Sequence, residues 1–313
     1  MMKWGKTSVG RQRWRCQFCK KSEIKARPDI TQSAHRKLFS SWLVGTHSLS
    51  DIASTEHVSR QTLHDWFTPF WKESPILQPL ALDDGILVVD AISLRGRRDV
   101  VLIGRTLTRV ISWTFAEHEN YASWKVFFQN IQPPKVVVCD GRRGLLQALK
   151  EVFPDATIQR CIIHIVRYAR SLLTQKPRYE AGQELSQLMI RLLQVRTRRQ
   201  KRRWKRRFFR WCKKYERFLS ERTYGEEKKR SWWYTHKKLR TVRTLILHAL
   251  PHVFTFIGHH PIPRTTNHVE GGINNRAKEL RRRHRGLSLE KQQVMISFFL
   301  SSKQKEKPTR KFT

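Results

Sequence analysis

Residues 86–90 read Ile-Leu-Val-Val-Asp, and residues 135–140 read Lys-Val-Val-Val-Cys-Asp. Each stretch is a short apolar run that ends in a carboxylate, and such runs are typical of buried strands. Two strands of this kind side by side would bring Asp90 and Asp140 together at one edge of a sheet. Each aspartate also has an ordinary explanation, because the first can simply end its strand and Asp-Gly at 140–141 is a common turn dipeptide.

The chain around these two runs alternates between strand and helix patterns. Two more apolar runs follow the first at hairpin-like distances, a helical pattern separates them from the second run, and another helix and strand follow it. The expected strands are residues 86–90, 100–104, 110–115, 135–140 and 157–163, and the expected helices are residues 121–131 and 143–153. This order predicts an α/β fold with a mixed sheet and helices packed against it.

The composition indicates a folded protein that binds a polyanion. The 313 residues include 63 lysines and arginines against 25 aspartates and glutamates, which gives a formal net charge of +38. A hydrophobic fraction of 39%, with 11 tryptophans and 16 phenylalanines, supplies a core and excludes a disordered basic tail. The sequence pI near 11 favours nucleic acid over a membrane surface as the partner. Structural proteins of ribonucleoproteins carry a similar charge, so charge alone does not indicate an enzyme.

Targeting signals and cysteine usage indicate a soluble cytoplasmic protein. Residues 1–10 are basic but lack the apolar segment of a signal peptide, and no apolar stretch reaches the roughly 18 residues that a membrane span needs. Five cysteines, an odd number in a long chain, do not indicate a disulfide framework. We therefore expect a cytoplasmic protein that acts on nucleic acid and has no membrane partner.

Residues 1–27 form a basic arm with a Cys-x-x-Cys turn at Cys16 and Cys19. Two cysteines supply half of the ligands of a closed zinc site, and the chain contains no second Cys-x-x-Cys. The arm therefore resembles the second half of a zinc ribbon whose first half is missing, as a truncated or misplaced start would leave it. The alternative is a disordered basic arm with two free thiols.

Residues 28–75 read as a small helical DNA-binding domain. The expected helices cover residues 32–44, 49–56 and 60–71. The last two follow Ser48 and Ser59, which are good N-cap residues. Two short helices with so tight a turn predict a helix-turn-helix, although His57 stands where glycine is common. The residues expected to face the major groove are Arg60, Gln61 and His64. The alternative is a plain three-helix core with a basic surface.

Residues 168–250 carry no strand signal and alternate basic residues with leucine and tryptophan, which predicts an all-helical segment. Between residues 196 and 214 there are 12 basic residues and no acid, with aromatic residues at helical spacing. One face of that helix must pack, and the other would contact phosphates. The candidate phosphate-binding residues are Arg202, Arg203, Lys205 and Arg206. Trp232 and Trp233 are candidates for stacking on unpaired bases, with core packing as the alternative.

A third carboxylate, Glu270, occurs towards the end of the chain. It stands three residues after Asn267, as in a capping box, and two glycines follow it within the first helical turn. Glycines are unfavourable inside a helix, so this pair indicates close approach of another backbone or of a nucleic-acid strand. The rest of the helix is basic, and its candidate DNA contacts are Arg276, Arg281 and Arg282.

Three carboxylates at one point would repel each other unless cations lay between them. Two Mg²⁺ or Mn²⁺ ions about 3.5–4 Å apart would clamp the attacking and leaving oxygens of a phosphodiester. Oxygen ligands favour these ions over zinc. The candidate metal ligands are Asp90, Asp140 and Glu270.

The order of these motifs resembles that of the Mutator-like DDE transposases, in the insertion sequence 256 type and its zinc-binding variant. The resemblance runs from about residue 11 to residue 299. It rests on Asp90, on the Asp-Gly at 140–141, on Gln-Arg-Cys-Ile-Ile-His at 159–164 and on Thr-Asn-His-Val-Glu-Gly-Gly-Ile-Asn at 266–274. The resemblance implies a ribonuclease H-like catalytic core that is interrupted by a helical insertion before the last acid.

The same resemblance implies roles for individual residues. The three acids would hold the catalytic metals, and the residues expected near the active centre are Cys161, His164 and Asn267. Without the resemblance, a small buried cysteine and a core histidine are simpler explanations for the first two. A zinc site of Cys16, Cys19, Cys161 and His164 has suitable ligand types, but the N-terminal arm would have to fold onto the core.

The expected protein has six parts. They are a partial zinc-ribbon-like arm (1–27), a helix-turn-helix domain (28–75), the first part of the catalytic core (83–167), a basic helical insertion (168–258), a closing helix with the third acid (259–300) and a basic tail (301–313). The resemblance implies DNA cleavage and strand transfer at the ends of a bacterial insertion sequence. The partners would be double-stranded terminal inverted repeats and target DNA, bound by a homodimer or larger assembly close to the nucleoid.

Two other functions fit parts of the sequence. A non-catalytic helix-turn-helix regulator, or an inactive transposase relic, would keep the DNA-binding domain and the charge but would need no triad of acids. A structural RNA-binding protein would explain the charge alone. It ranks last because it leaves the ordered acids unexplained.

Overall fold

The computed structural model describes most of the chain. The described residues are 1–8, 10–24, 28–75, 77, 80–82, 84–95, 98–225, 231–258, 262–266 and 273–304. The chain divides into two compact units, one of residues 1–76 with 280–299 and the other of residues 77–279 with 300–313. Among the described helices, none combines the length and the apolar character that crossing a membrane would require.

The first unit begins with a small antiparallel sheet in the order β1-β2-β3. Its strands are Met2–Lys6, Gln12–Arg15 and Ser22–Glu23. Cys16 and Cys19 lie in the turn between β2 and β3. The Cys16 N–H donates to the Lys21 carbonyl (2.8 Å), and the Lys20 N–H donates to the Cys16 carbonyl (3.1 Å). The arm therefore contains regular strands around its Cys-x-x-Cys turn.

Three helices follow in the same unit. They are α1 (Pro28–Val44), α2 (Leu49–Thr55) and α3 (Arg60–Phe67). Both expected N-caps are confirmed, because the Ser48 side chain accepts a hydrogen bond from the Asp51 N–H (3.2 Å) and the Ser59 side chain accepts one from the Thr62 N–H (3.0 Å). His57, in the turn between α2 and α3, has a φ of 53°, a left-handed conformation that glycine adopts more readily.

The third helix is shorter than the predicted residues 60–71. The α-helix ends at Phe67, and a 3₁₀ turn, η1, covers Thr68–Lys72. Pro69 explains the change, because proline has no N–H to donate and its ring crowds the carbonyl four residues earlier. Phe67 and Phe70 are both buried against Phe39 of α1, with ring centroids 5.4 and 5.6 Å from it.

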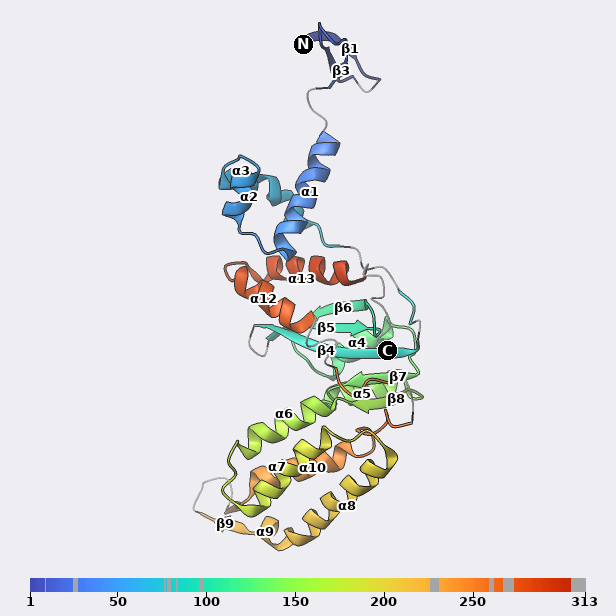
Figure 1. Ribbon diagram of the computed structural model, residues 1–313, viewed down its shortest axis with the longest axis vertical. Helices are drawn as coiled ribbons and strands as arrows, with labels where there is room; N and C mark the ends of the chain where they lie inside the picture. Colours follow the sequence, from blue (N-terminus) through green and yellow to red (C-terminus); the bar gives the residue numbers. More distant parts are fainter. Residues whose placement is uncertain are drawn as a thin grey trace. The chain divides into compact units, whose positions relative to one another are not determined.

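The second unit is built on a five-stranded sheet in the order β6-β5-β4-β7-β8 (Figure 1). Its strands are β4 (Ile86–Arg95), β5 (Arg98–Arg105), β6 (Val110–Ala116), β7 (Val136–Cys139) and β8 (Thr157–Arg160). β4, β5 and β6 pair antiparallel, whereas β7 pairs parallel with both β4 and β8. The mixed α/β sheet expected from the sequence is therefore confirmed.

Two helices, α4 (Tyr121–Gln129) and α5 (Arg143–Val152), pack with the sheet in one apolar cluster. Trp124, Phe127 and Phe128 of α4 are fully buried there. Val89 of β4 and Cys139 of β7 belong to the same cluster. Because side chains alternate along a strand, Asp90, which follows Val89 within β4, points to the opposite face of the sheet.

The fifth strand is shorter than the predicted residues 157–163, because α6 (Ile162–Leu173) begins within that stretch. Cys161 is the N-cap residue of α6, and its N–H still donates to the Cys139 carbonyl of β7 (2.7 Å). The apolar pattern continues into the helix because the first turn of α6 is also buried. An apolar run of this length does not distinguish a buried strand from a buried helix start.

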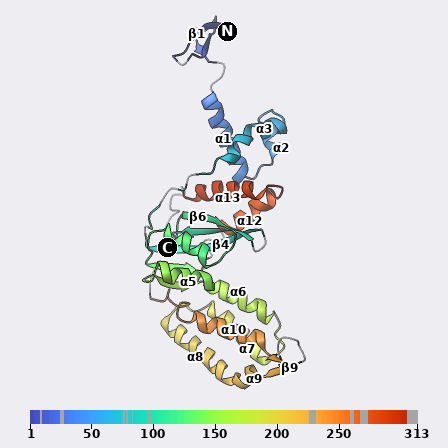
Figure 2. The ribbon, with the colours of Figure 1, turned by 180° about the vertical axis from the view of Figure 1, so that it is seen from behind.

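A group of helices follows the sheet in the sequence. Besides α6 they are α7 (Glu180–Leu192), α8 (Arg198–Lys214), α9 (Glu216–Ser220) and α10 (Lys237–Ala249). Figures 1 and 2 both show α6, α7, α8 and α10 side by side. Two indole N–H groups tie α8 to α7, because Trp204 donates to the Leu188 carbonyl and Trp211 to the Ala181 carbonyl, both at 2.9 Å.

A short hairpin interrupts this helical group, so the prediction that residues 168–250 contain no strand was wrong. β9 (Arg222–Tyr224) and β10 (Trp232–Tyr234) pair antiparallel. Their tryptophan, tyrosine and threonine residues favour strands, but three-residue strands are too short to give a periodic signal. Nε2 of His236 lies 2.8 Å from Oε2 of Glu221 and closes the base of the hairpin.

Two further helices complete the described elements, α12 (Asn275–Arg283) and α13 (Leu289–Gln304). In the first unit, Phe298 of α13 packs edge-on against Phe39 of α1, with ring centroids 5.5 Å apart. In the second unit, a short π-helical turn at residues 273–274 leads into α12.

Candidate functional site

Two paired strands bring two aspartates to one cavity. β4 and β7 run parallel, and their pairing ends with Val88 next to Val138. Asp90 and Asp140 each follow this last pair by two residues, and both line the same cavity. Asp90 points to the face of the sheet opposite α4 and α5, because Val89 before it in β4 packs under those helices. The convergence of the two carboxylates therefore follows from parallel pairing.

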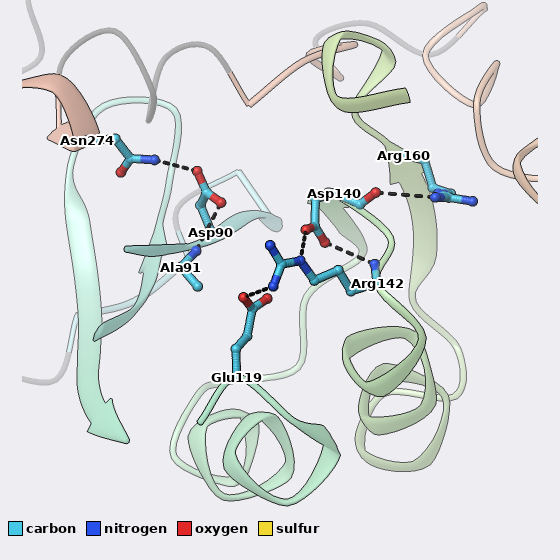
Figure 3. A network of polar contacts seen from close by, with 7 residues as sticks. All are labelled: Asp90, Ala91, Glu119, Asp140, Arg142, Arg160 and Asn274. Carbon is cyan, nitrogen blue, oxygen red and sulfur yellow. Dashed lines mark hydrogen bonds and ion pairs between the residues drawn. The ribbon is translucent and has the colours of Figure 1, made fainter. Parts of the chain in front are cut away.

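Asp90 lies in the middle of β4, and the prediction that it ends its strand was wrong. Antiparallel pairing with β5 carries β4 on beyond the last residues that pair with β7. The residue is only 9% exposed. Its Oδ1 accepts from the Ala91 N–H (2.9 Å), and its Oδ2 accepts from Nδ2 of Asn274 (2.6 Å; Figure 3). Burial raises the pKa of Asp90 to about 6, although the nearby His164 and both donors act to lower it.

Asp140 follows β7 in a tight loop. Its Oδ1 accepts from the Arg142 N–H (3.0 Å), and its Oδ2 lies 3.0 Å from Nε of the same arginine. Gly141 between them has a φ of 81°, and a Cβ atom there would lie 2.0 Å from Nε of Arg160. Glycine is therefore required both by the backbone conformation and by the close approach of Arg160, which donates to the Asp140 carbonyl (3.4 Å).

Glu119 is a third carboxylate at this site, and the sequence reasoning missed it. It precedes α4, and its Oε2 pairs with Nη1 of Arg142, so one guanidinium group bridges Glu119 and Asp140 (Figure 3). Burial raises the pKa of Glu119 to about 7; the guanidinium opposes this shift, and Asp140 and Asp90 add to it. The sequence contains a signal that could have identified this residue. Acidic residues are scarce in this chain, and Glu119 stands one residue before Asn120, the N-cap of a helix that the sequence predicts.

The three carboxylates line one cavity of about 540 Å³ together with basic side chains. Arg142, Arg167 and Lys278 also line it and are exposed residues. Carboxylate oxygens are suited to a divalent cation, and arginine and lysine are suited to phosphate oxygens. The cavity therefore has the chemistry to hold a cation and a phosphate group together.

The Gln-Arg-Cys-Ile-Ile-His segment (residues 159–164) begins in β8 and fixes a later part of the chain to this strand. Gln159 is fully buried; its Nε2 donates to the Val253 carbonyl (3.1 Å) and its Oε1 accepts from the Phe256 N–H (2.9 Å). These bonds hold residues 253–256 against β8. Gln159 therefore has a structural role, which its place in the sequence motif does not by itself indicate.

Cys161 and His164 belong to the same segment, and only His164 lines the cavity. Sγ of Cys161 accepts from the N–H and the hydroxyl of Thr266, at 3.3 and 3.4 Å. Burial acts to raise the pKa of Cys161, but hydrogen bonds from His164 and Thr266 outweigh it and lower the pKa overall. His164 itself lines the cavity beside Asp90, whereas Cys161 is fully buried behind it.

Asn267 and Glu270 lie outside the described residues. The first described polar residue after them, Asn274, already reaches Asp90. Its Oδ1 is buried and has no hydrogen-bond partner among the residues that the structure describes. Within the same described ranges, no three His, Cys, Asp or Glu side chains lie close enough together to hold one metal ion.

The two cysteines of the N-terminal arm belong to the first unit, whereas Cys161 and His164 belong to the second. Backbone N–H groups of Cys19 and Phe18 lower the pKa of Cys16. The turn therefore favours the thiolate form, which is the form that binds metal ions.

The residues expected to contact DNA lie mostly at the surface. The exposed ones are Arg60, Gln61, His64, Arg202, Arg203, Arg206, Trp233 and Arg282, and the half-buried ones are Lys205, Trp232, Arg276 and Arg281. On α8 the predicted division into two faces is confirmed, because Trp204, Phe208 and Trp211 are buried while three arginines of the same helix are exposed.

Comparison with known proteins assigns the family. The profile described as "Transposase, Mutator family" matches residues 85–289, about two thirds of the chain, including every strand of the five-stranded sheet. The chain belongs to the Mutator family of transposases. The matched range of this Mutator-family chain also contains every residue that lines the cavity.

Three individual transposases are similar to parts of the chain. The transposase for insertion sequence element IS905 of Lactococcus lactis subsp. lactis (strain IL1403) is 38% identical over 74 residues, which are 22% of this chain and 19% of that protein. The transposase for insertion sequence element ISRM5 of Rhizobium meliloti (strain 1021) is 29% identical over 117 residues, which are 36% of this chain and 27% of the relative. A probable transposase for an insertion sequence element of Corynebacterium diphtheriae is 23% identical over 87 residues, 26% of this chain and 25% of that protein. The matched stretches thus span about a quarter or less of these relatives.

Proposed function

We propose that this chain is a DDE transposase of the insertion sequence 256 type, which cleaves DNA at the ends of its element and joins the freed 3′ ends to target DNA. The observation that carries the proposal is that Asp90 and Asp140, which follow the parallel pairing of β4 with β7, line one cavity together with exposed cationic side chains. The strand order, with three antiparallel strands followed by two parallel ones, is the order expected of a ribonuclease H-like core and supports the same assignment.

A divalent cation fits the donors of this cavity. Asp90, Asp140 and Glu270 would hold Mg²⁺ or Mn²⁺, for which carboxylate oxygens are preferred ligands. The raised pKa values of Asp90 and Glu119 reflect buried negative charge that a cation would relieve. When bound, such ions would activate the attacking oxygen and stabilise the leaving oxygen of a phosphodiester.

The chain's own residues would position these groups. The Asn274 amide holds one oxygen of Asp90, and Arg142 holds both oxygens of Asp140. Arg167 and Lys278 line the cavity and would bind phosphates of the DNA strand that is cleaved. His164 adds a titratable donor next to Asp90.

Two other regions would bind DNA away from the cavity. We assign α2 and α3 as a helix-turn-helix that recognises the element ends, because the start of α3 leaves Arg60, Gln61 and His64 exposed. The exposed arginines of α8 would contact backbone phosphates. Two copies of the chain would act together on paired ends, and zinc would bind at the Cys16–Cys19 turn if a second pair of ligands is supplied.

The test is Mg²⁺-dependent cleavage of a plasmid that carries the DNA flanking the gene. Wild type is compared with Asp140→Asn and with Asp155→Asn, a matched control at an exposed aspartate of the same unit. We expect cuts at the element ends with wild type and the control, and none with Asp140→Asn, which should still bind the ends. Binding without cleavage by wild type, in Mg²⁺ and in Mn²⁺, would contradict the proposal and favour a regulator or an inactive relic.

A second measurement tests the metal ligands without reference to activity. Mn²⁺ binding to the full chain is followed by electron paramagnetic resonance. Asp90→Asn and Asp140→Asn should each weaken binding at least tenfold, whereas Asp155→Asn should leave it unchanged. Equal Mn²⁺ affinity in all four proteins would show that these aspartates are not metal ligands.

A further inference from the structure

A second cavity lies within the helical group, far along the chain from the carboxylates. It measures about 580 Å³ and lies between the end of α6, the start of α7 and the segment from β10 into α10. In Figure 1 the hairpin strand β9 marks this end of the helical group, beside α7 and α10. Neither the proposed metal site nor the proposed helix-turn-helix uses it.

Aromatic and apolar side chains form its walls. Trp233 and Tyr179 both line it and are 36% and 47% exposed. Tyr179 is held edge-on by the Phe218 and His236 rings, with centroids 5.5 and 5.2 Å away. Two large aromatic surfaces are thus open to a ligand.

The Trp233 ring is held in place from behind. A Cβ atom on Gly225 would lie 2.8 Å from Cη2 of this indole, so the ring lies directly against the glycine backbone. On the neighbouring wall, a Cβ atom on Gly182 would lie 2.8 Å from Cβ of Pro177, another lining residue. Trp233 and Pro177 are therefore packed closely against Gly225 and Gly182, and both still line the cavity.

The rim of the cavity is positively charged. Lys176, Arg178, Lys237 and Lys238 all line it and are exposed, and none of the described lining residues is acidic. An apolar interior with a cationic rim complements a ligand that has a flat uncharged ring and an anionic chain. A nucleotide has this combination, with a base that stacks on aromatic rings and phosphates that pair with lysine and arginine.

The backbone at the rim is strained. Thr174 follows α6, lines the cavity and has a φ of 66°, which is an outlier for a β-branched residue. Such conformations are strained and cluster at binding sites and ligand clamps. This strain is independent of the aromatic and charged side chains and marks the same place.

We propose that this cavity binds one unpaired nucleotide of a DNA strand, with its base between Trp233 and Tyr179 and its phosphates on the lysines and arginine of the rim. The proposal rests on the proposed function, because DNA cleavage at an element end is what would present an unpaired base. A base in an intact duplex is stacked between its neighbours and cannot enter, so the cavity distinguishes distorted from regular DNA.

The test compares two duplexes that differ by one unpaired nucleotide in the middle of one strand. The full-length protein is titrated with each duplex in EDTA, so that no cleavage occurs. We expect wild type to prefer the duplex with the unpaired nucleotide by about 5- to 150-fold, the range given by stacking of one base on an aromatic side chain. Trp233→Ala should remove most of this preference, and Trp233→Phe should retain part of it.

The matched control is Tyr224→Ala on β9, the strand paired with β10. Tyr224 is 70% exposed but does not line the cavity. This variant should keep the wild-type preference, and unchanged thermal melting of all variants shows that the hairpin is intact. Loss of preference in both Trp233→Ala and Tyr224→Ala would overturn the proposal.

Other outcomes separate this proposal from the proposed function. If wild type cleaves element ends and binds paired DNA but shows no preference for the unpaired nucleotide, the cavity proposal fails alone. If wild type binds neither duplex, both proposals fail. Free deoxynucleoside monophosphates are also titrated, and the signal of Trp233 is the part of the tryptophan quenching that Trp233→Phe loses. If they give this signal at the same concentrations as the duplex with the unpaired nucleotide, the cavity is a site for free nucleotides, and the proposal is overturned.

Discussion

At the scale of single residues, Arg142 decides how the charges of the carboxylate cavity are arranged. Its guanidinium lies between Glu119 and Asp140, and its backbone N–H holds Asp140 as well. The single positive charge of Arg142 therefore partly offsets the negative charges of Glu119 and Asp140. A metal ion that binds the same carboxylates would have to displace the arginine or share them with it.

Glu119 gives a pH-dependent prediction. Its pKa is about 7 in the folded protein, against 4.5 for an ordinary glutamate, because the side chain is largely buried. The folded state therefore binds the proton more tightly than the unfolded state, and this contribution to the free energy of unfolding is complete below about pH 4.5. It is lost as the pH rises from about 4.5 to about 7.

The measurement is urea unfolding of wild type and Glu119→Gln at pH 5 and pH 8 in EDTA. Because glutamine does not titrate, the stability of wild type should fall more steeply between these two pH values than that of the variant. Parallel changes in the two proteins would show that Glu119 does not carry the raised pKa. Glu151→Gln, at an exposed glutamate of α5, is the control that should follow wild type.

At the scale of elements, α8 combines a basic surface with an apolar packing side on one helix. Together with the loop residues just before it, α8 carries the twelve basic residues between positions 196 and 214, yet its apolar side holds it firmly. Trp204 stacks on Phe208 with ring centroids 5.6 Å apart and meets Phe254 edge-on at 5.7 Å. The capping box of Thr197 with Gln200 fixes its start.

We predict that Trp204→Ala lowers the free energy of unfolding by about 3–5 kcal/mol, because it removes a buried ring and the indole bond to α7. Phe209→Ala, on the exposed side of the same helix, should change it by about 0.5 kcal/mol or less. Chemical denaturation of the three proteins measures both values. Equal losses in the two variants would mean that α8 does not pack through the side that carries Trp204.

At the scale of the whole molecule, the net charge of +38 would dominate the affinity of the protein for any nucleic acid. Each phosphate that a lysine or arginine neutralises releases condensed counterions, so affinity falls steeply with salt. The charge is also distributed over several elements, among them α8 and α12, whose surfaces are rich in arginine.

We predict that affinity for an unrelated duplex falls by about 10³- to 10⁵-fold between 50 and 200 mM salt, the range for six to ten phosphate contacts. Replacing Arg202, Arg203 and Arg206 together by glutamine should reduce the slope of log K against log salt by about 2 to 3. Fluorescence anisotropy over a salt series measures both. An unchanged slope in the triple variant would exclude the exposed face of α8 from the DNA contacts.

Local sequence signals predicted the elements well where one short-range interaction fixes them. The starts of α2 and α3 follow from Ser48 and Ser59, and the five strands follow from apolar runs. The hairpin of β9 and β10 was missed because its strands are too short for a period. The extension of β4 past Asp90 was missed because pairing with β5, and not the apolar run, sets its length.

The sequence by itself determined the mixed sheet, an aspartate at the end of each of two apolar runs and the basic, amphipathic α8, because each depends on residue type and spacing along one stretch of chain. Only the tertiary structure brought Glu119 and Asn274 to the aspartates and joined Tyr179 with Trp233 around a second cavity. These groups are separated by tens to hundreds of residues. Their meeting depends on how the strands and helices pack, which no local pattern contains.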